Sequence, residues 1–191
     1  DLPLDLVRRA SVVLRVELDP DRRLAETDTR NNTEIVTLDF VPSPELAVTY
    51  VPIRYRPPGK PGTLPDADRI ARAAAWMKGT FPLAASALTY RRGRSIGFDE
   101  SLTPKATQRA LIARLNWLYA HPRVLNLGGS PDLLVGWLPR TGDTKVVGRS
   151  NPAWSAPAGL EHVVWVQDYA HGPETMAHEI SHNLGRRHPI R

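Results

Sequence analysis

The end of the chain contains three histidines and a glutamate at spacings that suit a metal site. These residues are His178, Glu179, His182 and His188, with Gly185 between the last two histidines. Positions four apart lie on one face of a helix, so a helix would direct the imidazoles of His178 and His182 to one point. Neutral imidazole binds zinc, and three protein ligands leave a fourth position for water, as in catalytic zinc sites. The spacing therefore predicts a zinc centre formed by His178, His182 and His188.

Gly185 and Glu179 have separate predicted roles in this centre. His188 cannot reach the metal if the helix simply continues, but glycine readily adopts the left-handed conformation that ends a helix. We therefore expect Gly185 to turn the chain and bring His188 back. Glu179 would accept a proton as zinc-activated water attacks a peptide carbonyl, and then pass that proton to the leaving amine. The competing interpretation is a polar helix surface with no metal.

Composition narrows the chemistry further. The 191 residues include no cysteine, which excludes disulfides and thiolate ligands and leaves His, Asp and Glu to hold a metal. The net charge is +5, but the basic residues are dispersed, which favours a solvated basic surface over a nucleic-acid interface. No apolar run reaches the length of a membrane span. A serine hydrolase has no support because no Gly-x-Ser-x-Gly motif occurs.

Residues 44–191 alternate between strand and helix patterns, which predicts an α+β fold with a mixed sheet covered by helices. Asp66 is the expected N-cap of the first helix, and Thr103 that of the second. Pro52 lacks an amide hydrogen and so favours an edge or bulged position for its strand. The predicted strands are 46–55, 88–98 with an interruption at Gly93, 133–138, 145–148 and 163–166; the predicted helices end near 78, 121 and 184.

Residues 1–43 have a different character and end within a Pro-Ser-Pro linker at 42–44. Alternating apolar residues predict a strand at 12–18, and a second strand is expected at 35–40. Two strands cannot bury a core alone, so we interpret the segment as part of a β-sandwich. The acidic residues between the strands could bind calcium but lack the spacing of a calcium loop, which favours solvated turns.

The pattern His178-Glu179-x-x-His182-x-x-Gly185-x-x-His188 matches the metzincin signature at every fixed position, and the chain resembles that family of zinc peptidases. The resemblance implies a twisted mixed sheet with the active-site helix at the C-terminal end of this domain. It also implies cleavage of proteins or peptides bound along an edge strand, for which 145–148 is our candidate. The cofactor implied is zinc.

One departure from the family pattern concerns methionine. Metzincins carry a methionine turn downstream of the third histidine, whereas this chain ends at Arg191. Met77 and Met176 lie upstream and cannot supply it. We therefore expect residues 44–191 to be a catalytic domain truncated before this turn, weakly active or inactive as a fragment.

Residues 16–21, 24–28 and 31–33 resemble the tail of a CARDB-type module, a bacterial immunoglobulin-like adhesion domain. This resemblance implies a modular bacterial protein that is secreted or displayed on the cell surface. The predicted function is thus a secreted zinc-dependent endopeptidase acting on proteins or peptides. The alternative is a non-catalytic extracellular adhesion or binding protein whose zinc site is structural or vestigial.

Overall fold

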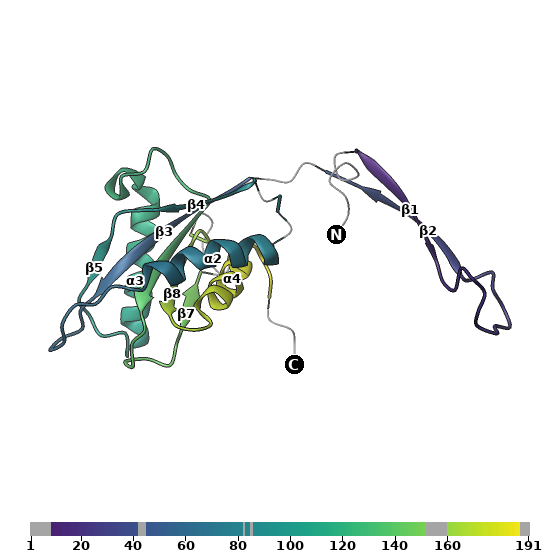
Figure 1. Ribbon diagram of the computed structural model, residues 1–191. Helices are drawn as coiled ribbons and strands as arrows, with labels where there is room; N and C mark the ends of the chain where they lie inside the picture. The colour runs from purple at the N-terminus through teal and green to yellow at the C-terminus, as the bar shows by residue number, and fades with distance from the viewer. Residues whose placement is uncertain (1–8, 42–44, 82, 85, 152–159, 188–191) are drawn as a thin grey trace. The chain divides into compact units, whose positions relative to one another are not determined.

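The computed structural model describes residues 9–41, 45–81, 83–84, 86–151 and 160–187. The chain divides into two compact units, Asp1–Ser43 and Pro44–Arg191. Figure 1 shows the elements of both units. No helix among the described residues is long and apolar enough to cross a membrane.

The first unit is an antiparallel ribbon of strands β1 (Ser11–Glu17) and β2 (Thr33–Asp39). Val12 pairs with Leu38 and Leu14 with Val36, so one face of the ribbon is apolar. The Asp19 carboxylate accepts hydrogen bonds from two backbone N–H groups of the connecting turn. Both predicted strands are confirmed, each starting or ending within two residues of its expected limit.

Three aspartates between the strands, Asp19, Asp21 and Asp28, are engaged by protein groups. Asp28 makes two hydrogen bonds with the Arg30 guanidinium at 3.0 Å, and Asp21 pairs with Arg23 at 3.0 Å. The Arg30 guanidinium lowers the pKa of Asp28. These contacts favour the solvated-turn interpretation over a calcium site.

The second unit is built on a twisted mixed sheet, as the sequence predicted. Its strands run in the order β4–β3–β6–β8–β7, with β5 beside the end of β3. All pairs are parallel except β7 with β8, which is antiparallel. The strands are β3 (Leu46–Tyr55), β4 (Leu88–Arg92), β5 (Ile96–Phe98), β6 (Leu133–Pro139), β7 (Gly148–Ser150) and β8 (Val163–Asp168).

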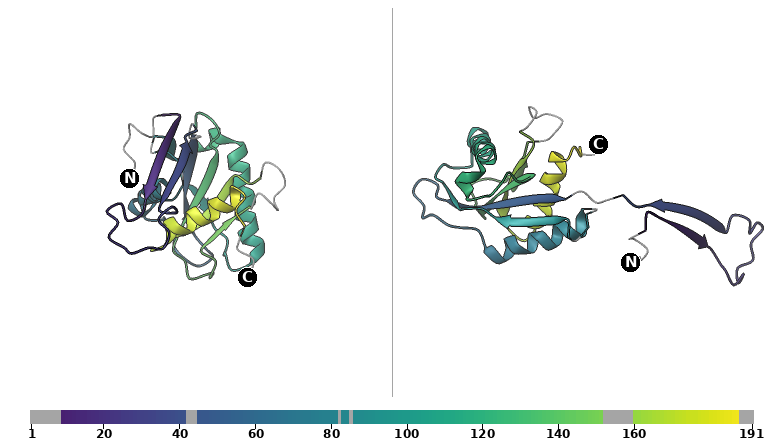
Figure 2. Two further views of the ribbon diagram at one scale, coloured as in Figure 1. Left: turned by 90° about the vertical axis from the view of Figure 1, so that its right-hand side faces the viewer. Right: turned by 90° about the horizontal axis from the view of Figure 1, so that it is seen from above.

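Three α-helices cover the two faces of this sheet (Figures 1 and 2). Helix α3 (Lys105–Ala120) packs on one face, where Leu111 and Leu115 meet Trp165 of β8. Helices α2 (Ala67–Thr80) and α4 (Gly172–Asn183) pack on the other face, where Met176 and Ile180 of α4 join the second core. A short 3₁₀ helix, η1 (Pro122–Leu125), follows α3. The candidate zinc helix thus lies against a sheet that is buried on both faces.

Pro52 does not mark an edge, so the edge alternative of that prediction is wrong: β3 is flanked by β4 and β5 on one side and by β6 on the other. The Tyr50 carbonyl accepts from the Gly93 N–H, so the backbone polar groups of even-numbered β3 residues face β4. Pro52 therefore turns its nitrogen toward the gap between β4 and β5, where no ladder hydrogen bond requires a donor. The interruption at Gly93, itself predicted, is what admits a proline into a central strand.

One of the two predicted helix caps is confirmed and the other is wrong. Asp66 is the N-cap of α2, since its carboxylate accepts from the N–H groups of Asp68 and Arg69 at 2.8 and 3.1 Å. Thr103 does not cap α3, whose N-cap is Pro104. The Thr103 hydroxyl instead donates to the Asp143 carbonyl at 2.8 Å, so a contact from a distant loop replaces the local cap.

The edge strand lies slightly later than predicted. Residues 145–147 are irregular, and β7 covers only Gly148–Ser150. The Thr144 hydroxyl accepts from the Val146 N–H at 3.1 Å, and the Gln167 side chain donates to the Val146 carbonyl at 2.7 Å. These side-chain bonds hold the backbone in a turn where a strand ladder would otherwise begin.

Candidate metal centre

Helix α4 presents the histidines because its other face is anchored to the sheet. Met176 and Ile180 are fully buried, and the Asn183 amide donates to the Val163 carbonyl at the start of β8 at 3.1 Å. Facing away from this core, His178 is exposed, while His182, one turn on, is only 6% exposed. The helix thereby holds one imidazole rigidly and leaves its neighbour open to solvent.

The imidazoles of His178 and His182 face each other through their Nε2 atoms. The Nε2 atoms of His178 and His182 are 3.0 Å apart, and the rings are nearly perpendicular at 81°. With zinc–nitrogen bonds of about 2.0–2.1 Å, tetrahedral coordination separates two nitrogen ligands by about 3.3–3.4 Å. A small opening of the pair would accommodate the ion.

Gly185 makes the turn that the sequence predicted, with φ at 92°. The Arg186 N–H donates to the Ser181 carbonyl at 2.9 Å, and the Gly185 N–H donates to the His182 carbonyl at 3.0 Å. This pair of bonds is the Schellman arrangement that ends helices at a left-handed residue.

The same turn determines which ring nitrogen of neutral His182 carries the hydrogen. The carbonyl of Arg186 lies 2.7 Å from His182 Nδ1 and has no proton to give, so Nδ1 must donate. In a neutral imidazole the lone pair is then on Nε2, the atom that faces His178. The turn therefore prepares His182 to act as a metal ligand.

Glu179 lies against the edge strand. Its Oε2 accepts a hydrogen bond from the Ser150 hydroxyl at 2.7 Å, and Ser150 is buried. A Cβ on Gly148 would lie 3.1 Å from Glu179 Cγ and 2.6 Å from Thr175 Cγ2, so only glycine leaves room for this approach. Alternate residues of β7 thus form a cradle that holds one carboxylate oxygen and leaves the other available.

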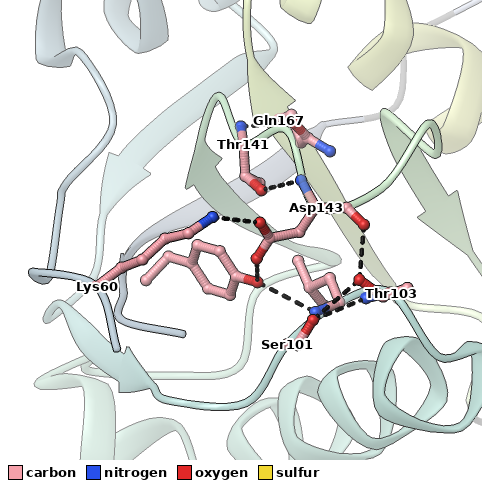
Figure 3. A network of polar contacts seen from close by, with 8 residues as sticks. Lys60, Ser101, Thr103, Thr141, Asp143 and Gln167 are labelled. Carbon is pink, nitrogen blue, oxygen red and sulfur yellow. Dashed lines mark hydrogen bonds and ion pairs between the residues drawn. The ribbon is translucent and has the colours of Figure 1, made fainter. Parts of the chain in front are cut away.

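The loop that leads from β6 to β7 is fixed by the polar network in Figure 3. The Asp143 carboxylate accepts from the Tyr55 hydroxyl at 2.7 Å and from Lys60 Nζ at 2.8 Å. The Asp143 N–H donates to Thr141 Oγ1, and its carbonyl accepts from Thr103.

The pKa values of Asp143 and Tyr55 are both shifted in this network. The ammonium of Lys60, and then the Tyr55 hydroxyl, lower the pKa of Asp143. Burial, and secondarily the bond to Asp143, raises the pKa of Tyr55 to about 12. The network fixes the loop in which Asp143 lies, and this loop leads into β7 and its contact with Glu179.

Of the predicted site residues, the described structure brings together His178 and His182, with Glu179 adjacent to His178 in the helix. His188 lies outside the described residues. Within the described part of the chain, no group of three His, Cys, Asp or Glu side chains is placed to hold a metal ion. A complete three-histidine ligand set therefore remains a prediction.

Two further histidines, His121 and His162, have structural contacts. His121 is the C-cap of α3, with Nδ1 donating to the Trp117 carbonyl at 2.7 Å. His162 stacks on Tyr119 with ring centroids 4.7 Å apart.

Both methionines upstream of the site belong to the core. Met77 and Met176 are fully buried against the sheet, so neither is available beneath the histidines.

Sequence reasoning missed the contributions of Ser150 and Arg186. Ser150 meets Glu179 across 29 positions of sequence, and no local pattern predicts such a contact. The Arg186 contribution comes from a backbone carbonyl, which any residue carries. The Gly185 turn was the available signal, since it sends the following carbonyl back toward the helix.

Comparisons with known proteins leave the family open. No protein-family description matches the chain, and no curated protein matches it. Among solved structures, a chain titled "Structure of a chaperone-substrate complex" matches 80% of this chain with 12% identity and a TM-score of 0.46. The crystal structure of metalloproteinase-II from Bacteroides fragilis matches 85% of it with 16% identity and a TM-score of 0.44.

The chain spans 27% of the first of these structures and 55% of the second. Similarities at this level do not define a family. The chain's own residues must therefore carry the functional conclusion.

Proposed function

We propose that this protein is a metzincin-type zinc endopeptidase in which His178, His182 and His188 bind zinc and Glu179 is the catalytic base. The observation that carries the proposal is the pair of Nε2 atoms 3.0 Å apart, with the proton of His182 fixed on its other nitrogen. Imidazole donors without any cysteine suit a catalytic zinc site open to water.

Bound zinc would supply Lewis acidity that activates water and polarises the substrate carbonyl. Glu179 Oε1 would take the proton from the attacking water as the new carbon–oxygen bond forms. It would return that proton to the amine nitrogen as the carbon–nitrogen bond breaks. The Ser150 hydroxyl holds Oε2 and so restrains the carboxylate during both transfers.

Strand β7 supports the binding of an extended substrate. It is the terminal strand of the sheet, and among the described residues no strand pairs with its outer side. Exposed backbone groups on such an edge can pair with a peptide in β conformation. The contact between β7 and Glu179 would bring that peptide to the base.

The proposal extends to the setting of the domain. The ribbon in residues 1–43 has an apolar face, and its sequence resembles a CARDB-like module. Both features support an extracellular modular protein. We therefore include secretion or cell-surface display in the proposal.

Replacing Glu179 with glutamine tests the proposed function in the full-length protein. Cleavage of casein should fall about 10²–10⁴-fold, the usual contribution of a general base, while bound zinc stays at one per chain. Glu174→Gln, on the same helix, is the matched control and should keep full activity. Unchanged proteolysis in the Glu179 variant would remove this residue from the mechanism.

The binding-protein alternative predicts a different pattern. The wild-type protein would then contain zinc but cleave neither casein nor a mixed peptide pool, and a chelator would change only its stability. That outcome would overturn the peptidase proposal and leave the zinc ligands in place.

A further inference from the structure

The face of β7 opposite Glu179 borders a hollow. It measures about 670 Å³ and lies between β7 and α3. Arg109, Asn116, Arg149 and Asn151 contribute its polar lining, and Ile112 is part of its wall. Ser150 borders it as well, so the hollow adjoins the strand that holds the proposed catalytic base.

Arg149 is fixed in this hollow by a buried neutral group. Its guanidinium donates to Gln108 Oε1 at 3.2 Å, and Gln108 is 2% exposed. The Gln108 amide nitrogen donates to the Leu102 carbonyl at 2.8 Å, which sets which way the amide points. This hydrogen bond orients the Arg149 guanidinium. Because the Gln108 oxygen is uncharged, the bond does not neutralise the positive charge of Arg149.

No carboxylate offsets the two arginines within the described residues. The residues that line the hollow include no Asp or Glu, and neither Arg109 nor Arg149 forms an ion pair with a described group. Two cations on one hollow favour an anionic ligand. An acidic side chain of a peptide supplies the carboxylate that two arginines on one hollow favour.

The geometry of β7 gives such a peptide a route to the hollow. Arg149 pairs with Trp165, whose side chain packs in the α3-side core, whereas Gly148 and Ser150 face Glu179. Side chains of an extended peptide alternate in the same way. A peptide along β7 would therefore direct every second side chain toward the arginines.

We propose that the hollow between α3 and β7 is a specificity site that binds an aspartate or glutamate side chain of the peptide substrate. This inference rests on the proposed function, because it takes β7 as the substrate-binding edge. It names the preferred substrate class as acidic peptides.

The test uses peptides in which one Glu is moved along an otherwise neutral sequence, each with a matched Gln peptide. At one position or two alternate positions, Glu should raise kcat/KM about tenfold or more, as expected for bonds between charged groups. Arg109→Gln and Arg149→Gln should each reduce that preference several-fold. Arg114→Gln, on α3 but outside the hollow, should not change it.

Arg109→Glu should reverse the preference toward a Lys-containing peptide, and this exposed position carries little risk to folding. Binding of the same peptides to the Glu179→Gln variant, followed by fluorescence anisotropy, gives a readout independent of cleavage. Tighter binding of the Glu peptides that weakens with Arg109→Gln supports the specificity site even if cleavage fails. Cleavage that is indifferent to Glu at every position, and unchanged in both arginine variants, would overturn it while the peptidase proposal stands.

Discussion

The Asp143 network and the pair His178–His182 are both polar clusters of the same unit, but their hydrogen bonds differ in kind. All four polar positions of Asp143 meet complementary protein groups: both carboxylate oxygens, the N–H and the carbonyl. The two histidines instead face one another through identical atoms, with the His182 proton already donated elsewhere. A saturated network stabilises the fold, whereas two imidazoles that share one proton between their Nε2 atoms can exchange that proton for a cation.

This contrast predicts that substitutions in the two clusters will affect different properties. Changes at the histidines should alter metal binding and leave folding nearly intact. Changes at Asp143 should do the reverse.

The largest effect is expected for His178→Ala. His178 is exposed, so its removal should cost little stability. The loss of a ligand should raise the zinc Kd by more than about 100-fold, since even the loss of a residue that only orients a ligand costs 10–100-fold. Competition with a chromophoric chelator measures this, with the exposed His121→Ala as control. Equal zinc affinity in the two variants would contradict the assignment of His178 as a zinc ligand.

Asp143→Asn should act on folding instead. Asparagine keeps the shape but weakens the bonds to Tyr55 and Lys60, which should lower the free energy of unfolding by about 1–3 kcal/mol. Urea denaturation measures this loss, and the zinc Kd should stay within about twofold of wild type. A large loss of zinc affinity would show that the network belongs to the metal site.

The stability that Asp143 contributes should depend on pH. The pKa of Asp143 is lowered from 3.8 in the folded protein, so its contribution is complete above the unfolded value and is lost as pH falls through the folded value. The stability difference between wild type and Asp143→Asn should therefore shrink below about pH 4. A difference that grows in acid would contradict the cause assigned to this pKa.

The smallest effect is expected for Ser150→Ala. The hydroxyl restrains Glu179 but touches neither the histidines nor the proposed substrate carbonyl, so kcat should fall about five- to tenfold with KM nearly unchanged. Zinc content and melting temperature should match wild type. A change in KM alone would assign Ser150 to substrate binding and not to the positioning of the base.

Local chemistry explains what the sequence could predict. The Asp66 cap, the Gly185 turn and the strand at 46–55 depend on residues close together in the chain, and all three are confirmed. The shared face of His178 and His182 follows from helical spacing alone.

The failures came from contacts between distant residues. Pro52 is tolerated in a central strand because it faces the gap between β4 and β5. The sequence around Pro52 does not reveal this gap, so an edge position was predicted. Thr103 does not cap α3 because its hydroxyl donates to the Asp143 carbonyl. Strand β7 begins later than predicted because the Gln167 side chain binds the Val146 carbonyl. The Ser150 contact with Glu179 belongs to the same class, as it joins a strand to a later helix.

X-ray absorption at the zinc edge tests the proposed metal centre most directly. The full-length protein, loaded with one zinc per chain, should show three imidazole nitrogens and one oxygen at about 2.0–2.1 Å. His188→Ala should show two imidazoles, and His178→Ala should lose stoichiometric zinc. A protein that binds no stoichiometric zinc, or a spectrum with fewer than two imidazoles, would contradict the assignment of α4 as a zinc-binding helix.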